Sequence, residues 1–319
     1  MKRREFLKAT TVAAPVLSCF PKTLTAVTGK SRQLKLEKRV LGRTGEKLSI
    51  LGFGGIVVMN ATPEQSEQRV REAIEYGVNY FDVAPSYGDA EIKLGPALEP
   101  YRSKVFLACK TQERKKEGAL KELEQSLKHL RTDHFDLYQL HAVTTLEEVE
   151  TIFGSNGAME VFLEAKKAGK IRYIGFSAHS VEAALALMER FEFDTLLFPF
   201  NFTTWYAGNF GPQVLAKAQE KKMGILALKA MAKGPWPEDS KNKIPKCWYE
   251  PLTDPQEALM GLRFTLTQPV TAAIPPGNEN LFKKALDLAI RFKPLEPEEM
   301  MAVKEKGLAG KPLFRYPEG

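Results

Sequence analysis

From Gln33 onward, short apolar runs alternate with longer segments in which apolar residues recur every three or four positions. The short runs predict buried strands, and the longer segments predict amphipathic helices. Eight such pairs follow one another, which is typical of an α/β protein with a parallel sheet. We predict the eight strands at Ile50–Gly54, Tyr80–Val83, Val105–Lys110, Phe135–His141, Ile171–Ser177, Thr195–Pro199, Gly224–Lys229 and Ala272–Ile274.

Local signals place several boundaries between these strands. Thr62 as N-cap, followed by a proline, predicts a helix over Pro63–Tyr76. The apolar spacing predicts another over Glu113–Leu130, and Gly154–Gly157 is expected to split the helical region after the fourth strand. The long irregular stretch Met231–Pro255 follows the seventh strand, where long loops commonly carry function.

These elements predict a (β/α)8 TIM barrel that forms one domain over residues 33–319. A short antiparallel hairpin, Leu36–Val40 with Lys47–Ser49, comes first and is expected to cap the bottom of the barrel. The alternative is a doubly wound parallel sheet. It is disfavoured because no G-x-G-x-x-G sequence follows the first strand.

Residues 1–30 have a different character. Arg3 and Arg4 precede a mild apolar run, Ala9–Phe20, which is too short to cross about 30 Å of hydrocarbon. The segment resembles a twin-arginine signal, so the export machinery for folded proteins is an expected partner, and the location is expected to be the periplasm or envelope. Cys19 ends a stretch similar to a lipoprotein cleavage box, which leaves a lipid anchor as one option. An ordinary basic amphipathic N-terminus is the alternative.

The composition is that of a globular protein, with 44% hydrophobic and 27% charged residues among 319. Six basic residues and one acid lie within positions 1–30, so five of the seven net positive charges belong to that segment. The small remaining charge does not favour a nucleic-acid partner. Three cysteines, Cys19, Cys109 and Cys247, form no C-x-x-C pair, so neither a metal site nor a disulfide framework is expected.

Four polar residues stand at or just after the ends of three successive predicted strands: Asp82, Tyr87, Lys110 and His141. Barrel enzymes keep their active sites at the carboxyl ends of the strands, so we expect these side chains to meet. A buried lysine needs a carboxylate partner, and its charge is expected to lower the pKa of a neighbouring phenol. An imidazole could orient a substrate oxygen or share its proton. Each residue alone could be structural, but together they predict acid–base chemistry on a carbonyl or alcohol.

The chain also resembles the aldo-keto reductase family over nearly all of its length after the leader. The segments that carry the resemblance are Leu41–Gly45, Gly52–Gly55, Glu91–Gly95 and Leu130–His141. The resemblance implies that Asp82, Tyr87, Lys110 and His141 form the family's catalytic tetrad. It also implies a nicotinamide cofactor lying across the rim of the barrel, and it does not imply an iron–sulfur cluster, since the cysteine motif that some relatives carry is missing.

The expected cofactor contacts follow from the same resemblance. Ser177 would meet the nicotinamide amide, Asn201 would take the place of a glutamine common in the family, and Lys229 would contact the diphosphate. Gly55, Gly277 and Asn280 complete the expected set. No basic cluster for a 2′-phosphate is found, and Glu279 would repel one, so the sequence leaves both NADP and NAD open.

The sequence thus predicts an NAD(P)-dependent oxidoreductase that interconverts carbonyl compounds, sugars among them, and alcohols, with Tyr87 as the general acid. An exported enzyme would fold around its cofactor and retain it, because no nicotinamide pool is expected outside the cytoplasm. The alternative is a nicotinamide-binding barrel that serves as a non-catalytic accessory protein. The specific substrate, the direction of the reaction and the oligomeric state are not predicted.

Overall fold

A computed structural model describes residues 35–241 and 243–317 of the chain. The predicted signal segment at residues 1–30, with Cys19, lies outside the described residues. Eight parallel strands form one sheet in the order β12-β9-β8-β7-β6-β5-β4-β3. Their bounds are β3 (Phe53–Gly54), β4 (Tyr80–Asp82), β5 (Phe106–Thr111), β6 (Phe135–Val143), β7 (Ile171–Ala178), β8 (Thr195–Pro199), β9 (Gly224–Leu228) and β12 (Ala272–Ile274).

The two edges of this sheet meet and close it into a barrel. The Gly52 N–H donates to the Ala273 carbonyl, and the Ala273 N–H donates to the Ile50 carbonyl, both at 2.9 Å. Because both faces of each strand are covered, the strands are nearly continuous apolar runs rather than alternating ones. The predicted (β/α)8 barrel and the positions of its eight strands are therefore confirmed.

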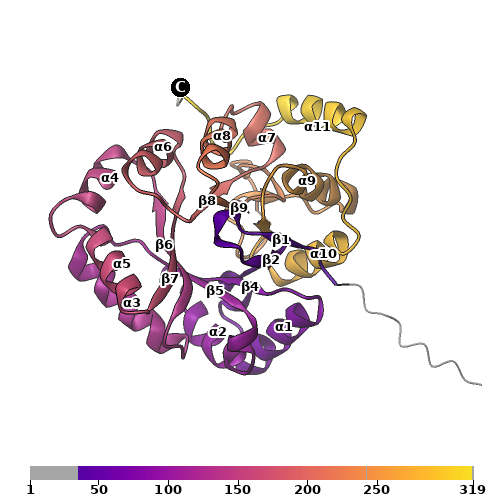
Figure 1. Ribbon diagram of the computed structural model, residues 1–319. Coiled ribbons are helices and arrows are strands. Elements are labelled where there is room, and N and C mark those ends of the chain that lie inside the picture. The colour runs from indigo at the N-terminus through magenta and orange to yellow at the C-terminus, as the bar shows by residue number, and fades with distance from the viewer. Residues whose placement is uncertain (1–34, 242, 318–319) are drawn as a thin grey trace, which may run out of the picture. The chain divides into compact units, whose positions relative to one another are not determined.

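Helices surround the strands, as Figure 1 shows. Capping fixes several of their starts: Thr62 and Thr145 each form a capping box with a residue three positions on, Gln65 and Glu148. The break predicted in the fourth helical region separates α4 from α5. The helices are α1 (Pro63–Glu75), α2 (Ala90–Leu98), α3 (Lys116–His129), α4 (Leu146–Phe153), α5 (Ala158–Lys167), α6 (Val181–Arg190), α7 (Phe202–Tyr206), α8 (Pro212–Glu220), α9 (Pro255–Thr267), α10 (Glu279–Ala289) and α11 (Pro297–Ala309), with 3-10 turns at Gly42–Thr44, Gly55–Val58 and Glu99–Lys104.

The hairpin of β1 (Lys38–Val40) and β2 (Lys47–Ser49) closes the amino-terminal end of the barrel. Its Leu41 and Leu48 belong to the apolar cluster inside the barrel. The turn approaches the start of β9 so closely that a side chain at Gly42 would meet a backbone nitrogen at 2.3 Å. The expected cap at the barrel bottom is thus confirmed, and it appears in indigo over the middle of the strands in Figure 1.

The opposite, carboxyl-terminal end is shaped by two long segments. The stretch after β9 contains a small antiparallel pair, β10 (Ala232–Gly234) with β11 (Glu250–Pro251), which the sequence analysis treated as irregular. After α11 the chain returns to this end, where Phe314 packs against Phe210 with ring centroids 5.0 Å apart. Among the described residues, no helix is both long and apolar enough to cross a lipid bilayer.

Candidate active site

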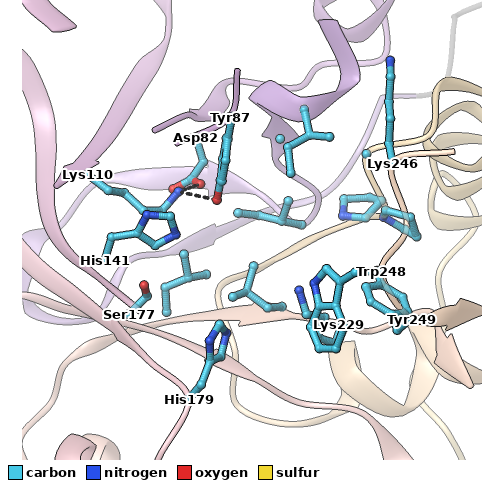
Figure 2. Close-up of a pocket in the computed structure, with 18 residues that line it drawn as sticks. Asp82, Tyr87, Lys110, His141, Ser177, His179, Lys229, Lys246, Trp248 and Tyr249 are labelled. Atoms are coloured by element: carbon cyan, nitrogen blue, oxygen red, sulfur yellow. Dashed lines mark hydrogen bonds and ion pairs between the residues drawn. The ribbon is translucent and has the colours of Figure 1, made fainter. Parts of the chain in front are cut away.

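A cavity of about 200 Å³ opens at the carboxyl ends of the strands (Figure 2). Asp82 ends β4, Tyr87 lies on the loop after it, and Lys110 and His141 lie near the ends of β5 and β6. All four line this cavity. The structure therefore brings together the four residues that the sequence placed at strand ends.

Lys110 and Asp82 form a buried ion pair at the base of the cavity. Their side chains are 1% and 2% exposed, and the ammonium donates to Oδ1 of the carboxylate. Burial alone would lower the pKa of Lys110, but the charge of Asp82 and the phenol of Tyr87 outweigh it and raise that pKa above its usual value. Lys110 is thus held in its charged form.

Two further residues hold the carboxylate of Asp82. The hydroxyl of Tyr80 and the amide nitrogen of Gln139 each donate to its Oδ2 at 3.0 Å. Both side chains are fully buried inside the barrel. Three donors on one carboxylate fix its position and, through it, the position of the lysine.

The hydroxyl of Tyr87 lies 3.3 Å from Nζ of Lys110, within hydrogen-bonding distance. From the sequence, this cation is expected to lower the pKa of the phenol. In the structure burial has the larger effect and raises the pKa of Tyr87, while Lys110 opposes the rise without reversing it. That expectation was therefore wrong for the protein alone, and the consequence is a phenol that keeps its proton and can donate it.

His141 lies at an irregularity in β6. The register between β6 and β7 shifts between Leu140 and Val143, and Ala142 has a left-handed φ of 53°. The backbone N–H of Ala142 donates to Oγ of Ser177 at 2.8 Å, and this hydrogen bond links the irregularity to β7. Burial, followed by the charge of Lys110, lowers the pKa of His141 to about 2. The imidazole is therefore neutral, which suits hydrogen bonding to a substrate oxygen better than carrying a proton.

The other side of the cavity is built by β7, β9 and the long loop after β9. Ser177 and His179 come from the end of β7, and Lys229 follows β9 directly. Trp248 and Tyr249 reach the cavity from the loop just before β11. Figure 2 shows His179 and Lys229 across the cavity from Tyr87.

The predicted cofactor contacts divide into two groups. Ser177, Lys229 and Gly277 line the cavity. Gly55 packs against Val83, where a side chain would clash at 2.5 Å, and its neighbours Gly54 and Ile56 line the cavity in its place.

Two asparagines of the predicted set lie elsewhere. Asn201 is 1% exposed and caps α7, its Oδ1 accepting from the Thr204 N–H at 2.9 Å, while Leu197 of the same strand region lines the cavity. Asn280 lines a neighbouring cavity of about 290 Å³. Its N–H donates to Oδ1 of Asn278 at 3.1 Å, so the N-cap already uses an amide that we expected to receive phosphate.

Glu279 bridges two cations between these two cavities. Its carboxylate lies 3.3 Å from Nζ of Lys246 and 3.5 Å from a guanidinium nitrogen of Arg69. Both cations also donate to the Val57 carbonyl. The charge that the sequence analysis expected to repel a 2′-phosphate is therefore balanced by basic residues that are distant in the sequence.

Several residues of the site were not predicted from the sequence. Tyr80 and Gln139 each stand two positions before a tetrad residue, so the two-residue period of a strand places them on the same inward side and could have identified them. His179 stands two positions after Ser177 by the same rule. Trp248 and Tyr249 carried no such signal, because the path of their loop is not encoded in a local period.

The cavity also suits one end of a nicotinamide cofactor. Its walls are largely apolar, with Leu197, Leu228 and Ile274 beside the polar tetrad, which is the combination that binds a flat, partly polar ring. Ser177 supplies a buried hydroxyl at one edge. In residues 35–241 and 243–317, no group of His, Cys, Asp or Glu side chains is arranged to hold a metal ion.

Fold and site together define a (β/α)8 barrel with a phenol, an ammonium, a carboxylate and an imidazole gathered at its mouth. Comparison with known proteins identifies the family. Residues 51–292 match the model of the aldo/keto reductase family, and the chain belongs to this family.

Two curated relatives illustrate the similarity in sequence. Aldo-keto reductase YhdN of Bacillus subtilis is 30% identical over 218 residues, which is 62% of this chain and 63% of that protein. L-galactose dehydrogenase of Arabidopsis thaliana is 32% identical over 49% of this chain and 53% of its own length. The chain therefore aligns with less than two thirds of each.

Solved structures show the similarity in fold. An aldo-keto reductase from Bacillus halodurans in its holo form superposes with a TM-score of 0.69 at 22% identity, covering 88% of this chain and 99% of that one. An aldo/keto reductase from Klebsiella pneumoniae in complex with NADP and acetate gives a TM-score of 0.66 at 20% identity, with the same coverage.

Proposed function

We propose that this protein is an NAD(P)-dependent oxidoreductase that interconverts carbonyl compounds and alcohols, with Tyr87 as the general acid and base. The observation that carries the proposal is the hydroxyl of Tyr87, which lies 3.3 Å from the ammonium of Lys110 at the wall of a cavity. Family membership supports the same chemistry. No observation favours a non-catalytic accessory role.

In the reductive direction, a reduced nicotinamide held in this cavity would supply the hydride for the substrate carbonyl carbon. Tyr87 donates its proton to the oxygen, on which negative charge develops. Lys110, fixed by Asp82, stabilises the phenolate that remains. The neutral ring of His141 stands edge-on to Tyr87, with centroids 5.6 Å apart, and orients the carbonyl oxygen by a hydrogen bond.

The cofactor contacts stay within the same proposal. Ser177 would meet the nicotinamide amide. Gly277 would border the path of the cofactor toward the neighbouring cavity, which Asn280 lines. Lys229 was predicted from the sequence as the diphosphate contact, but its position near His141 is better suited to a group on the substrate. Gly55 would act by shaping the wall beside Gly54, and Asn201 by holding the end of β8. NADP and NAD are both compatible with this site, since an NADP complex of the Klebsiella relative is known and Glu279 is balanced by two cations here.

Replacing Tyr87 with Phe tests the acid–base role, because it removes one oxygen and leaves the ring. We expect turnover of aldehydes to fall by about 10²-fold or more while the dissociation constant for NADPH or NADH stays within a few fold. Tyr101→Phe, at a partly buried tyrosine outside the cavity, serves as the matched control. Turnover by Tyr87→Phe equal to that of the control would refute the mechanism.

The proposal extends to location. Arg3, Arg4 and the apolar run after them support export in the folded state, with lipid attachment at Cys19 as an option. An enzyme exported in this way would carry a retained cofactor and regenerate it by coupling two substrates. Denaturing the protein isolated from the cell envelope should then release NADP or NAD, whereas Arg3→Lys with Arg4→Lys should leave the protein in the cytoplasm. Envelope protein that releases no nicotinamide would contradict retention.

Sugars and sugar-derived aldehydes are the proposed substrate class. Two relatives support this choice by their names, L-galactose dehydrogenase and 6-dehydroglucose reductase. A panel of aldoses and their dehydrogenated forms, followed by cofactor absorbance, tests it.

A further inference from the structure

Lys229 is a cation without an anion. Its Nζ lies over the rings of Trp248 and Tyr249, 4.9 Å and 5.1 Å from their centroids. Among the residues that the structure describes, no carboxylate pairs with it and no hydrogen bond engages its Nζ. Aromatic faces favour a positive charge only weakly compared with a carboxylate, so the ammonium keeps its capacity to bind an anion.

His179, which lines the same cavity, also has a polar atom without a partner. Its Nε2 is buried and has no hydrogen-bond partner within the described part of the chain. The ring is nevertheless held in place, because it stacks on Phe314 with centroids 5.3 Å apart and its N–H backbone group donates to the Val143 carbonyl at 3.0 Å. A fixed, buried nitrogen without a partner in the described protein atoms is available to hydrogen-bond a ligand.

The two groups face the reacting end of the site. Both line the cavity that holds Tyr87 and His141 (Figure 2). Lys229 is also close enough to His141 for its charge to contribute to lowering the pKa of that ring. The diphosphate of a dinucleotide is separated from the nicotinamide by a ribose, so a cation near His141 is better placed for a group on the substrate.

We propose that Lys229 and His179 form an oxyanion-binding pair that receives the carboxylate of an oxo-acid substrate, sugar acids included. This inference rests on the proposed function, because it assumes that the carbonyl of the same molecule reaches Tyr87. Lys229 supplies the charge, and His179 supplies a neutral hydrogen-bond donor. The apolar side chains that line the cavity lower the local polarity and so strengthen both interactions.

The protonation states agree with this geometry. Burial, aided by the charge of Lys110 and opposed by Cys247, lowers the pKa of Lys229 to about 8. Burial and then the charge of Lys229 lower the pKa of His179 to about 4. A carboxylate between them would relieve the repulsion and raise the pKa of Lys229 toward its usual value.

The test compares two aldehydes of the same size, 4-oxobutanoate and 4-oxobutanamide, which differ by one negative charge. The readout is the ratio of their kcat/KM values, measured on the full chain with saturating cofactor. We expect the wild type to prefer the acid by about tenfold or more, as for a hydrogen bond to a charged group. Lys229→Met should bring the ratio near one, and Lys229→Arg should retain most of the preference.

Two variants complete the series. His179→Phe keeps the stacking on Phe314 but removes the ring nitrogens, and it should lower the ratio by severalfold. Lys233→Met is the matched control, since Lys233 belongs to the same loop but is exposed and paired with Glu250 at 2.7 Å. A ratio in Lys229→Met equal to that of the control would overturn the proposal.

The competing source of an anion is the cofactor diphosphate, and a separate arm detects it. The dissociation constants of NADPH and NADH are measured by calorimetry for the same variants. A tenfold weakening in Lys229→Met with an unchanged acid-to-amide ratio would assign the lysine to the diphosphate and overturn the proposal.

A third arm separates this inference from the proposed function. Butanoate and butanamide carry no aldehyde, and their effects on the thermal midpoint are compared at equal concentrations. A larger rise with butanoate, lost in Lys229→Met, supports the pair even if no aldehyde is turned over, in which case the proposed function fails instead. No difference between the two ligands in the wild type overturns the pair even if aldehydes are reduced.

Discussion

Replacing Asp82 with Asn removes one charge from the buried pair while preserving the shape of the side chain. The carboxylate accepts from three donors, Lys110 on one oxygen and Tyr80 and Gln139 on the other. An asparagine offers one oxygen and one NH2 group. If the oxygen faces Lys110, the NH2 group faces two donors, and if it is turned round, the NH2 group faces the ammonium.

The magnitude follows from this geometry. With side chains only 1% and 2% exposed, water cannot replace what is lost. Removing one partner of a buried ion pair typically lowers the free energy of unfolding by about 3–5 kcal/mol. Two lost hydrogen bonds to a charged acceptor, at about 1.5–3 kcal/mol each, give a similar figure. We therefore expect the free energy of unfolding to fall by about 3–5 kcal/mol, a large part of the stability of an ordinary domain.

Urea denaturation with linear extrapolation measures this change. Asp133→Asn is the control, because that carboxylate is 94% exposed and water screens its pair with His134, so its loss should leave stability almost unchanged. The double variant Asp82→Asn with Lys110→Met should lose at least about 1 kcal/mol less than the sum of the single losses, since it leaves no lone charge. A loss below 1 kcal/mol for Asp82→Asn, or strict additivity in the double variant, would refute the electrostatic reasoning.

Two further predictions concern pH and the cofactor. The pKa of His141 is lowered to about 2 and that of His179 to about 4, so below about pH 6.5 the unfolded chain binds protons that the folded one does not. Stability should therefore fall as the pH drops. In urea denaturation, His179→Gln should recover about 2 kcal/mol of the loss in unfolding free energy between pH 6.5 and 5. Equal slopes of stability against pH for the wild type and the variant would contradict the burial of that ring. Glu279→Gln frees Lys246 and Arg69 from their shared carboxylate, so calorimetry should show the affinity for NADPH relative to NADH rising by about 2- to 10-fold, whereas an unchanged ratio would place the 2′-phosphate elsewhere.

The barrel was predictable from the sequence because its signals are local. Each strand is a short apolar run, and signals such as Thr62 before Pro63 mark where a helix begins. The meeting of Asp82, Tyr87, Lys110 and His141 at one cavity was predictable for the same reason, since a residue at a strand end needs only the strand to place it. Lys110, for instance, is positioned by the apolar run from Phe106 and by the parallel order of the sheet.

The parts that could not be predicted depend on contacts between distant segments. Ala142 adopts a left-handed conformation without being glycine, because the hydrogen bond of its N–H to Ser177 holds it there. Trp248 and Tyr249 reach the cavity through the pairing of β10 with β11, two strands of three and two residues that no periodicity reveals. The pKa of Tyr87 was expected to fall because Lys110 was recognised as its neighbour. The burial of the phenol, which has the larger and opposite effect, was not considered.

The two lysines of the cavity show how the same side chain serves two purposes at one barrel mouth. Lys110 is paired with the carboxylate of Asp82, which keeps its ammonium charged whether or not a ligand is bound. That charge is therefore always available to stabilise a phenolate. Lys229 contacts aromatic rings and, within the described part of the chain, pairs with no carboxylate. Its positive charge therefore lowers the folding stability unless an anion binds. Under our two proposals, the unbalanced charge of Lys229 would contribute binding energy for the molecule whose carbonyl Tyr87 would protonate.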